Sequence, residues 1–152
     1  IQMIYNHKPS QYFHKYIDGP STPLYPFGFG LSYTRFAYSS LKLSHTRISD
    51  KDSFTASIEL TNVGDREGTE VVQLYIRDIY SSATRPVKEL KDFARVTLKP
   101  GEKKTVTFTV TPDKLAYWNR NMQYGVEKGE FEIMIGSSSQ DKDLKKVKME
   151  VL

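Results

Sequence analysis

Apolar and polar side chains alternate along most of this chain, and the alternation restricts the folds it can adopt. The pattern starts near residue 36 and is clearest in a run whose apolar positions are Phe54, Ala56, Ile58 and Leu60. Successive side chains of a β-strand point to opposite faces, so a period of two gives one apolar and one polar face. The same period returns at 72–76, 106–110, 131–135 and 147–151. We therefore expect half-buried antiparallel strands and very little helix.

The segments between these runs carry the residues that turns require. Lys99-Pro100-Gly101-Glu102 has proline where φ is about −65° and glycine where φ is positive, which predicts a type II turn. Residues 62–68 are expected to form a longer loop. The apolar positions of 89–98 change phase midway, which predicts a bend or bulge near Lys91 and Asp92.

One short helical turn is expected within 111–118. Thr111 offers an N-cap hydroxyl, Pro112 suits the first helical position, and Asp113 places an acid in the first turn. Trp118 follows this turn. We expect it to pack in the core or at an edge rather than to form an exposed platform.

The strand count indicates the fold class. With an opening strand near 41–43, the chain contains about seven strands at regular spacing. A length of 152 residues fits one domain with one core. We therefore predict an all-β, seven-stranded immunoglobulin-like or fibronectin type III-like sandwich over residues 36–152.

Residues 1–35 have a different composition. They contain eight of the 19 aromatic residues and four of the seven prolines, without sustained alternation. We interpret this segment as an extended, aromatic-rich arm. A free arm of this composition would expose a large apolar surface, so we expect it to be held against protein.

Several segments resemble one enzyme family. Pro23-Leu24-Tyr25-Pro26-Phe27-Gly28-Phe29-Gly30-Leu31-Ser32-Tyr33-Thr34-Arg35-Phe36 closely resembles the passage by which glycoside hydrolase family 3 enzymes enter their C-terminal fibronectin type III-like domain. Tyr5 to Ser10 is similar to the linker that follows the α/β sandwich domain of that family. Further similar segments follow in the family's order at 61–65, 71–75, 85–93, 98–102 and 129–139, so the resemblance covers essentially the whole chain.

The resemblance implies a longer parent enzyme, similar to a β-glucosidase or β-xylosidase, that works by the retaining mechanism. That chemistry needs two carboxyl groups about 5 Å apart. In the family they lie on a preceding barrel and an α/β sandwich domain, and a (β/α)₈ barrel alone takes about 250 residues. We therefore expect no catalytic residue in this chain and no activity from it alone.

Two functions remain open for such a piece. The first is a non-catalytic accessory domain that docks on the missing barrel and α/β sandwich domains of the same chain and stabilises them. The alternative is a carbohydrate-binding module that holds β-glucan or xylan near the active site. The family also implies a periplasmic or secreted protein. The first residues from Ile1 show no signal peptide, so we expect the sequence to be cut from something longer.

Composition argues against other classes of function. The net charge of +4 is spread along the chain and forms no basic stripe interleaved with aromatics, so we expect no nucleic-acid partner. No apolar run approaches the ~18 residues of a membrane span. His7, His14 and His45 lack metal-ligand spacing, and there is no phosphate-binding loop, so we expect no metal and no cofactor.

The best candidate functional residues are in the arm. Aromatic rings could dock on a neighbouring domain or stack on sugar, because a pyranose C–H face packs well on a flat ring. The glycines of Phe27-Gly28-Phe29-Gly30 are expected to form a tight turn between packed aromatics. The candidates for domain docking or sugar contact are Tyr5, His7, Tyr25, Phe27, Gly28, Phe29 and Gly30. Glu130 and Glu132 share one strand face, and we expect both to be solvated.

Overall fold

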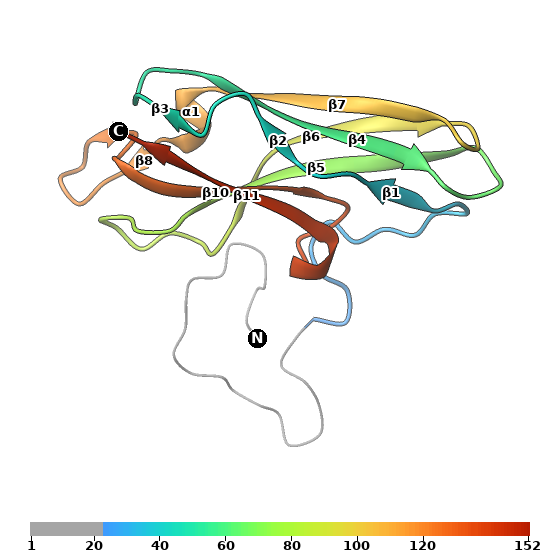
Figure 1. The fold of residues 1–152 in the computed structure, drawn as a ribbon. Helices are drawn as coiled ribbons and strands as arrows, with labels where there is room; N and C mark the ends of the chain where they lie inside the picture. Colours follow the sequence, from blue (N-terminus) through green and yellow to red (C-terminus); the bar gives the residue numbers. More distant parts are fainter. Residues whose placement is uncertain (1–22) are drawn as a thin grey trace.

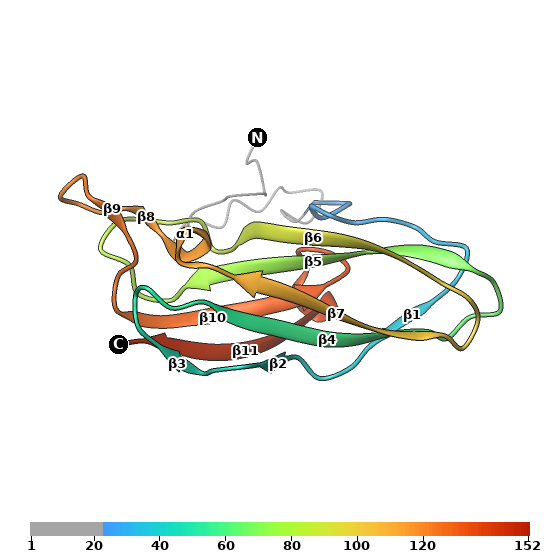
Figure 2. The same cartoon turned by 90° about the horizontal axis from the view of Figure 1, so that it is seen from above.

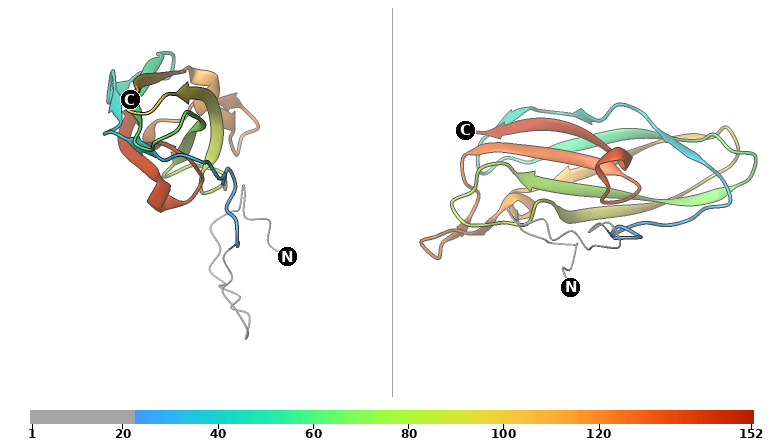
Figure 3. Two further views of the ribbon diagram at one scale, coloured as in Figure 1. Left: turned by 90° about the vertical axis from the view of Figure 1, so that its right-hand side faces the viewer. Right: turned by 90° about the horizontal axis from the view of Figure 1, so that it is seen from below.

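The computed structural model describes residues 23–152, which form two packed β-sheets (Figure 1). In the first sheet β4 (Phe54–Asn62) pairs with β7 (Lys103–Val110) and with the short strands β1 (Phe36–Tyr38) and β2 (Lys42–Leu43). The second sheet has the order β3 (Arg47–Ile48), β11 (Leu144–Val151), β10 (Gly129–Gly136), β5 (Gly68–Asp78) and β6 (Glu89–Leu98). The end-on view in Figure 3 shows the two layers closing around one interior. The expected all-β sandwich is confirmed.

The opening edge of the sandwich is more divided than expected. β2 lies where the first strand was predicted, but β1 and β2 both pair antiparallel with β4, and β3 then pairs parallel with β11. The chain thus crosses from one sheet to the other between β2 and β3. Strands of two or three residues are too short to show a period of two, which explains why alternation did not reveal this split.

The predicted alternation is confirmed in the long strands. The inward side chains of β4, β5, β7 and β10 are at most 6% exposed. They form one continuous core with Leu98, Met149 and Val151. Burying one such large apolar side chain stabilises the folded state by about 1.5–3 kcal/mol. This core between the sheets gives the sandwich most of its hydrophobic stabilisation.

The turn and bulge predictions are also confirmed. The backbone N–H of Glu102 donates to the carbonyl of Lys99 at 3.0 Å, and Gly101 has φ of 75°. In the pairing of β5 with β6, Leu74 lies opposite Asp92 while Tyr75 lies opposite Leu90. Lys91 is therefore the extra residue of a bulge.

The segment after β7 contains the expected helical turn, α1 (Pro112–Leu115). Thr111 precedes the helix, but its side chain makes no capping hydrogen bond, so the predicted N-cap hydroxyl was wrong. The extended Thr111 backbone and Pro112 at the helix start are enough to begin this single turn. A hairpin of β8 (Tyr117–Trp118) and β9 (Tyr124–Gly125) follows and projects from one end of the sandwich (Figure 2).

The five-stranded sheet also buries side chains on its outer face. Tyr75 and Met134 are fully buried there and pack with Leu144 and the partly buried Leu90. This outer cluster lies close to the short 3₁₀ helix η1 (Asp141–Asp143), which leads into β11. None of the helices within residues 23–152 has the length and apolar character needed to cross a membrane.

Candidate functional site

A tight turn at the end of the arm lies against the outer face of the five-stranded sheet. The backbone N–H of Phe29 donates to the carbonyl of Pro26 at 3.1 Å, which closes a β-turn. Gly28 is the third residue of that turn and has φ of 77°, a conformation that glycine adopts without steric cost. The expectation of a tight turn at this glycine therefore agrees with the backbone.

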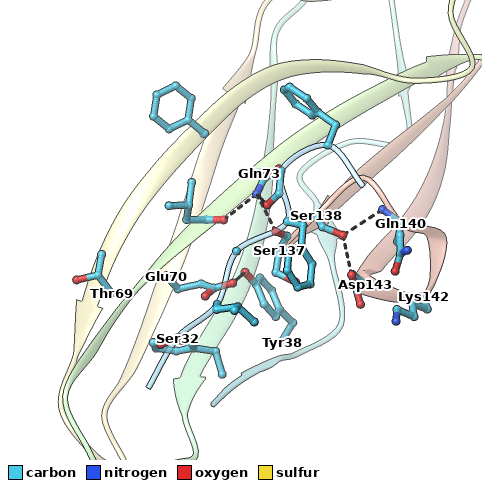
Figure 4. Close-up of a pocket in the computed structure, with 18 of the residues that line it drawn as sticks. Ser32, Tyr38, Thr69, Glu70, Gln73, Ser137, Ser138, Gln140, Lys142 and Asp143 are labelled. Atoms are coloured by element: carbon cyan, nitrogen blue, oxygen red, sulfur yellow. Dashed lines mark hydrogen bonds between the residues drawn. The ribbon is translucent and has the colours of Figure 1, made fainter. Parts of the chain in front are cut away.

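Gln73 of β5 fixes this turn to the sheet (Figure 4). Its amide nitrogen donates to the carbonyl of Gly28 at 3.0 Å and to that of Ser137 at 2.7 Å. Its amide oxygen accepts a hydrogen bond from the hydroxyl of Tyr75 at 2.5 Å. A β-carbon added to Gly28 would lie 2.0 Å from that amide oxygen, so the contact leaves no room for a side chain.

A second anchor holds the arm where it enters β1. The hydroxyl of Thr34 donates to the side-chain oxygen of Asn62 at 2.8 Å. The buried amide nitrogen of Asn62 donates in turn to the carbonyls of Arg66 and Leu98, at 2.7 and 2.9 Å. Residues 26–35 are thus tied to the sandwich at both ends by buried polar groups, which are costly to leave unpaired.

Between the two anchors lies a groove of about 770 Å³. The residues that line it include Phe27, Phe29 and Leu31 of the arm and Phe93 of β6. Its floor contains the carboxylate of Glu70, which accepts a hydrogen bond from the Tyr38 hydroxyl at 2.8 Å.

The polar pair in this groove is partly shielded from water. Burial raises the pKa of Glu70, and the hydrogen bond from Tyr38 only partly opposes that rise. The pKa of Tyr38 is also raised, mainly by burial and then by the charge of Glu70. The groove thus combines apolar walls with one carboxylate that prefers its neutral form more than a carboxylate in water does.

The candidate arm residues are only partly covered. The exposed fractions of Tyr25, Phe27 and Phe29 are 66%, 40% and 43%, and the rings of Tyr25 and Phe29 lie 5.2 Å apart between centroids. Leu24, Leu31 and Tyr33 are even more exposed, at 86%, 90% and 93%. Gly30 lies between Phe29 and Leu31, with open space around its α-carbon. Tyr5 and His7, and the arm aromatics before residue 23, lie outside the described residues.

The opposite end of the sandwich carries aromatic residues that the sequence interpretation missed. Trp118 is 61% exposed, so the expectation that it would be packed away was wrong. Its neighbour Tyr117 is the buried one, because β8 is a strand in which successive side chains face opposite ways. The Tyr-Trp pair followed by Tyr124 was the available signal for this hairpin.

Buried charged side chains, one of them packed against Tyr117, lie at the hairpin end of the sandwich. Arg85 lies over the ring of Tyr117 at 4.6 Å, and it donates to Asp78 and to the carbonyl of Leu115, both at 3.3 Å. Burial raises the pKa of Asp78 even though Arg85 opposes the rise. Such a charge cluster fixes the loop between β5 and β6 against α1.

The described residues offer no arrangement for metal or paired-carboxylate chemistry. Within 23–152, no group of three His, Cys, Asp or Glu side chains could hold a metal ion. Glu130 is exposed and pairs with Lys148 at 3.2 Å, as expected for a solvated position, and Glu132 is half-buried on the same strand. The arm groove and the exposed hairpin aromatics are therefore the features with which this part of the chain could bind something.

Comparison with known proteins agrees with the fold. Residues 70–139 match the family model described as "Fibronectin type III-like domain". The matched segment runs from within β5 to just after β10 and is similar to the fibronectin type III-like domain family. Together with the relatives described next, the match confirms the resemblance to the domain found in glycoside hydrolase family 3 enzymes.

Proteins of similar sequence include a β-glucosidase and a β-xylosidase. The chain is 48% identical over 132 residues to a periplasmic β-glucosidase of Salmonella typhimurium, covering 87% of this chain and 17% of that protein. It is 49% identical over 137 residues to a β-xylosidase of Formosa agariphila, covering 90% of this chain and 19% of that protein. Among solved structures, a β-glucosidase from Erythrobacter marinus superposes with a TM-score of 0.90 at 41% identity, over 97% of this chain and 19% of that one. The chain thus spans about a fifth of the relatives it matches.

Proposed function

We propose that this domain is a non-catalytic accessory domain of a β-glucosidase-like or β-xylosidase-like enzyme, and that it docks on the catalytic domains through its arm. The observation that carries the proposal is the contrast within residues 24–33. Hydrogen bonds at Gly28 and at the adjoining Thr34 tie this segment to the sandwich, while Leu24, Leu31 and Tyr33 are almost fully exposed. Apolar side chains held rigidly in water favour a protein partner.

The proposed partners are the barrel and the α/β sandwich domain of the same polypeptide. The relatives named above are four to five times longer than the part this chain matches, which supports further domains. The arm residues before Pro23 would connect to those domains. A periplasmic or secreted location is proposed from the relative that is named a periplasmic enzyme.

Sugar binding by the arm is the less favoured alternative. If the arm enters from a preceding domain and docks on it, its aromatic rings are covered in the whole enzyme and cannot reach polysaccharide. A surface that binds substrate has to stay in solvent, away from the arm. For that reason we assign the arm to docking.

The docking proposal is tested in the full-length gene product. Leu31→Ala combined with Tyr33→Ala is expected to lower the melting temperature of the catalytic domains by several degrees, because the interface would lose two apolar anchors. Leu152→Ala is the matched control, because Leu152 is 56% exposed and follows β11, at the other end of the sandwich from the segment where the arm enters β1. An unchanged melting temperature in the double variant, or a gene that encodes no catalytic domain beside this one, would refute the proposal.

A further inference from the structure

The hairpin β8–β9 presents a small aromatic surface that the fold itself does not use. Trp118 and Tyr124 lie opposite each other in the two-stranded register, with ring centroids 5.4 Å apart and planes inclined by 52°. They are 61% and 55% exposed. The hairpin projects beyond the end of both large sheets, away from the arm segment (Figures 1 and 2).

The tip of this hairpin is rigid. Its backbone is closed by hydrogen bonds from Asn119 to Gln123 and from Met122 to Asn119, both at 3.0 Å. The side-chain oxygen of Asn119 also accepts from the N–H groups of Asn121 and Gln123, at 2.9 and 3.0 Å. Met122 has a positive φ of 57°, a strained conformation that persists only where surrounding bonds impose it.

The base of the hairpin is fixed as well. Glu127, just after β9, accepts hydrogen bonds from the Tyr117 hydroxyl and from the hydroxyl of Ser82, the latter at 2.6 Å. The N–H of Ser82 also donates to Glu127 at 3.1 Å. The loop between β5 and β6 thereby holds the strand that carries Trp118, and the exposed ring is positioned before any ligand arrives.

The size of this surface argues against a protein partner. A large aromatic side chain offers about 150–250 Å² for contact, so the exposed parts of these two rings amount to roughly 250 Å². A stable protein interface needs about 800 Å² from each partner. Two rings on a narrow hairpin fall well short of that area.

The same surface fits one sugar ring. A pyranose with equatorial hydroxyls has an apolar C–H face that stacks on an aromatic plane, and hydroxyls around its edge that need hydrogen-bonding groups. Arg120 and Gln123 are exposed in the hairpin tip, two residues from Trp118 and one residue from Tyr124 in sequence, and their side chains carry such groups. A ring already held in place loses little entropy on binding.

We propose that Trp118, buttressed by Tyr124, is a binding site for one pyranose unit of a β-linked gluco- or xylo-oligosaccharide. The choice of these sugars as probes rests on the proposed function, whereas the aromatic site itself rests on the hairpin geometry. The hairpin and β1, which the arm enters, lie at opposite ends of the sheets (Figures 1 and 2), so a partner docked next to β1 does not have to cover this site.

The test is a titration of the chain, residues 1–152, with cellotetraose and xylotetraose. Trp118 is the single tryptophan of the sequence, so its fluorescence reports directly on this site. We expect a saturable change in emission with a dissociation constant of about 1 mM, measured up to about 10 mM sugar. Calorimetry then compares variants without depending on the tryptophan signal. Trp118→Ala is expected to weaken binding at least tenfold and Tyr124→Ala by a smaller factor.

Controls distinguish sugar binding at Trp118 from binding at the arm, from unfolding and from dimerisation. Tyr33→Ala, which removes an even more exposed ring from the arm, is expected to leave sugar binding unchanged. The amide NMR spectrum of each variant shows whether the sandwich remains folded. No saturable change with either sugar, or binding that survives Trp118→Ala in a folded protein, would overturn the proposal. So would concentration-dependent dimerisation lost in Trp118→Ala, which would assign the surface to a second copy. None of these outcomes bears on docking, which is tested in the full-length protein.

Discussion

The two aromatic pairs of this domain have similar spacing but are positioned in different ways. The rings of Tyr25 and Phe29 in the arm are 5.2 Å apart, and those of Trp118 and Tyr124 in the hairpin are 5.4 Å apart. The arm pair depends on Gln73, which is 45 residues from its partner Gly28 in sequence. The tip of the hairpin, next to the other pair, is closed by bonds that span two to four residues, whereas its base is tied to Ser82, 45 residues from Glu127.

This difference shows which parts of the protein each pair depends on. The arm pair keeps its position only while the outer face of the five-stranded sheet is intact. The hairpin pair keeps its own geometry through a local turn. Changes in the outer face should therefore affect the arm and leave the hairpin as it is, and changes in the hairpin turn should do the reverse.

The largest effect is expected from Gln73→Ala. The change removes the donor to the carbonyls of Gly28 and Ser137 and leaves the buried Tyr75 hydroxyl without its acceptor. We expect the free energy of unfolding to fall by about 3 kcal/mol, measured by urea denaturation. The exposed Gln123→Ala is the matched control, expected within about 0.5 kcal/mol of wild type. An equal loss in both variants would contradict the role assigned to Gln73.

A smaller loss, of about 2 kcal/mol, is expected from Gly28→Ala. The new methyl would lie 2.0 Å from the Gln73 amide oxygen, at a residue whose φ is 77°. Gly30→Ala is a close control, because it lies two residues away with open space and without a positive φ. It is expected to change the free energy of unfolding by less than about 0.5 kcal/mol. Trp118 fluorescence should be unchanged in both, and a shifted emission in Gly28→Ala would show that the two regions are coupled.

Much of the difference between the arm pair and the hairpin pair could not be predicted from the sequence. The alternation of 54–60 and 131–135 predicted the core face, because one side of each strand packs against the other sheet. It did not predict that Tyr75 and Met134 would be buried on the opposite face, since that burial depends on the segments covering the sheet there. Gly28 was identified as a turn residue, but its bond to Gln73 joins segments 45 residues apart. The exposure of Trp118 could not be predicted, because a strand of two residues is too short to show by alternation which of Tyr117 and Trp118 faces the interior.

A local effect of about 1 kcal/mol is expected from Asn119→Ala. The side chain of Asn119 holds two N–H groups of the hairpin tip, and without it the turn should open more often. Amide hydrogen exchange at Gln123 and Tyr124 should become about fivefold faster, which corresponds to that energy, while exchange in β5 stays the same. Asn121→Ala is the control at an exposed neighbouring position. Faster exchange throughout the domain would mean that the hairpin is not a local unit.

The smallest expected effects concern how stability depends on pH, which should differ in direction between a carboxylate near the arm and one below the hairpin. The pKa of Glu70 near the arm is raised by burial, so its ionisation destabilises the fold as pH rises above the value in the unfolded chain. The pKa of Glu127 below the hairpin is lowered, chiefly by its hydrogen bond from Ser82, so its ionisation stabilises the fold until pH falls through the lowered value. Glu70→Gln should therefore increase the free energy of unfolding near pH 7, and Glu127→Gln should decrease it.

Both changes should be modest because solvent reaches these carboxylates, and for Glu70→Gln we expect less than about 1 kcal/mol. The two variants should converge with wild type as pH falls from about 7 toward about 3, where the carboxyl groups become protonated in folded and unfolded chains alike. Urea denaturation across that range measures the convergence. If both variants shifted stability in the same direction at pH 7, the shielded groove of the arm and the hydrogen-bonded base of the hairpin could not be the opposite environments described above.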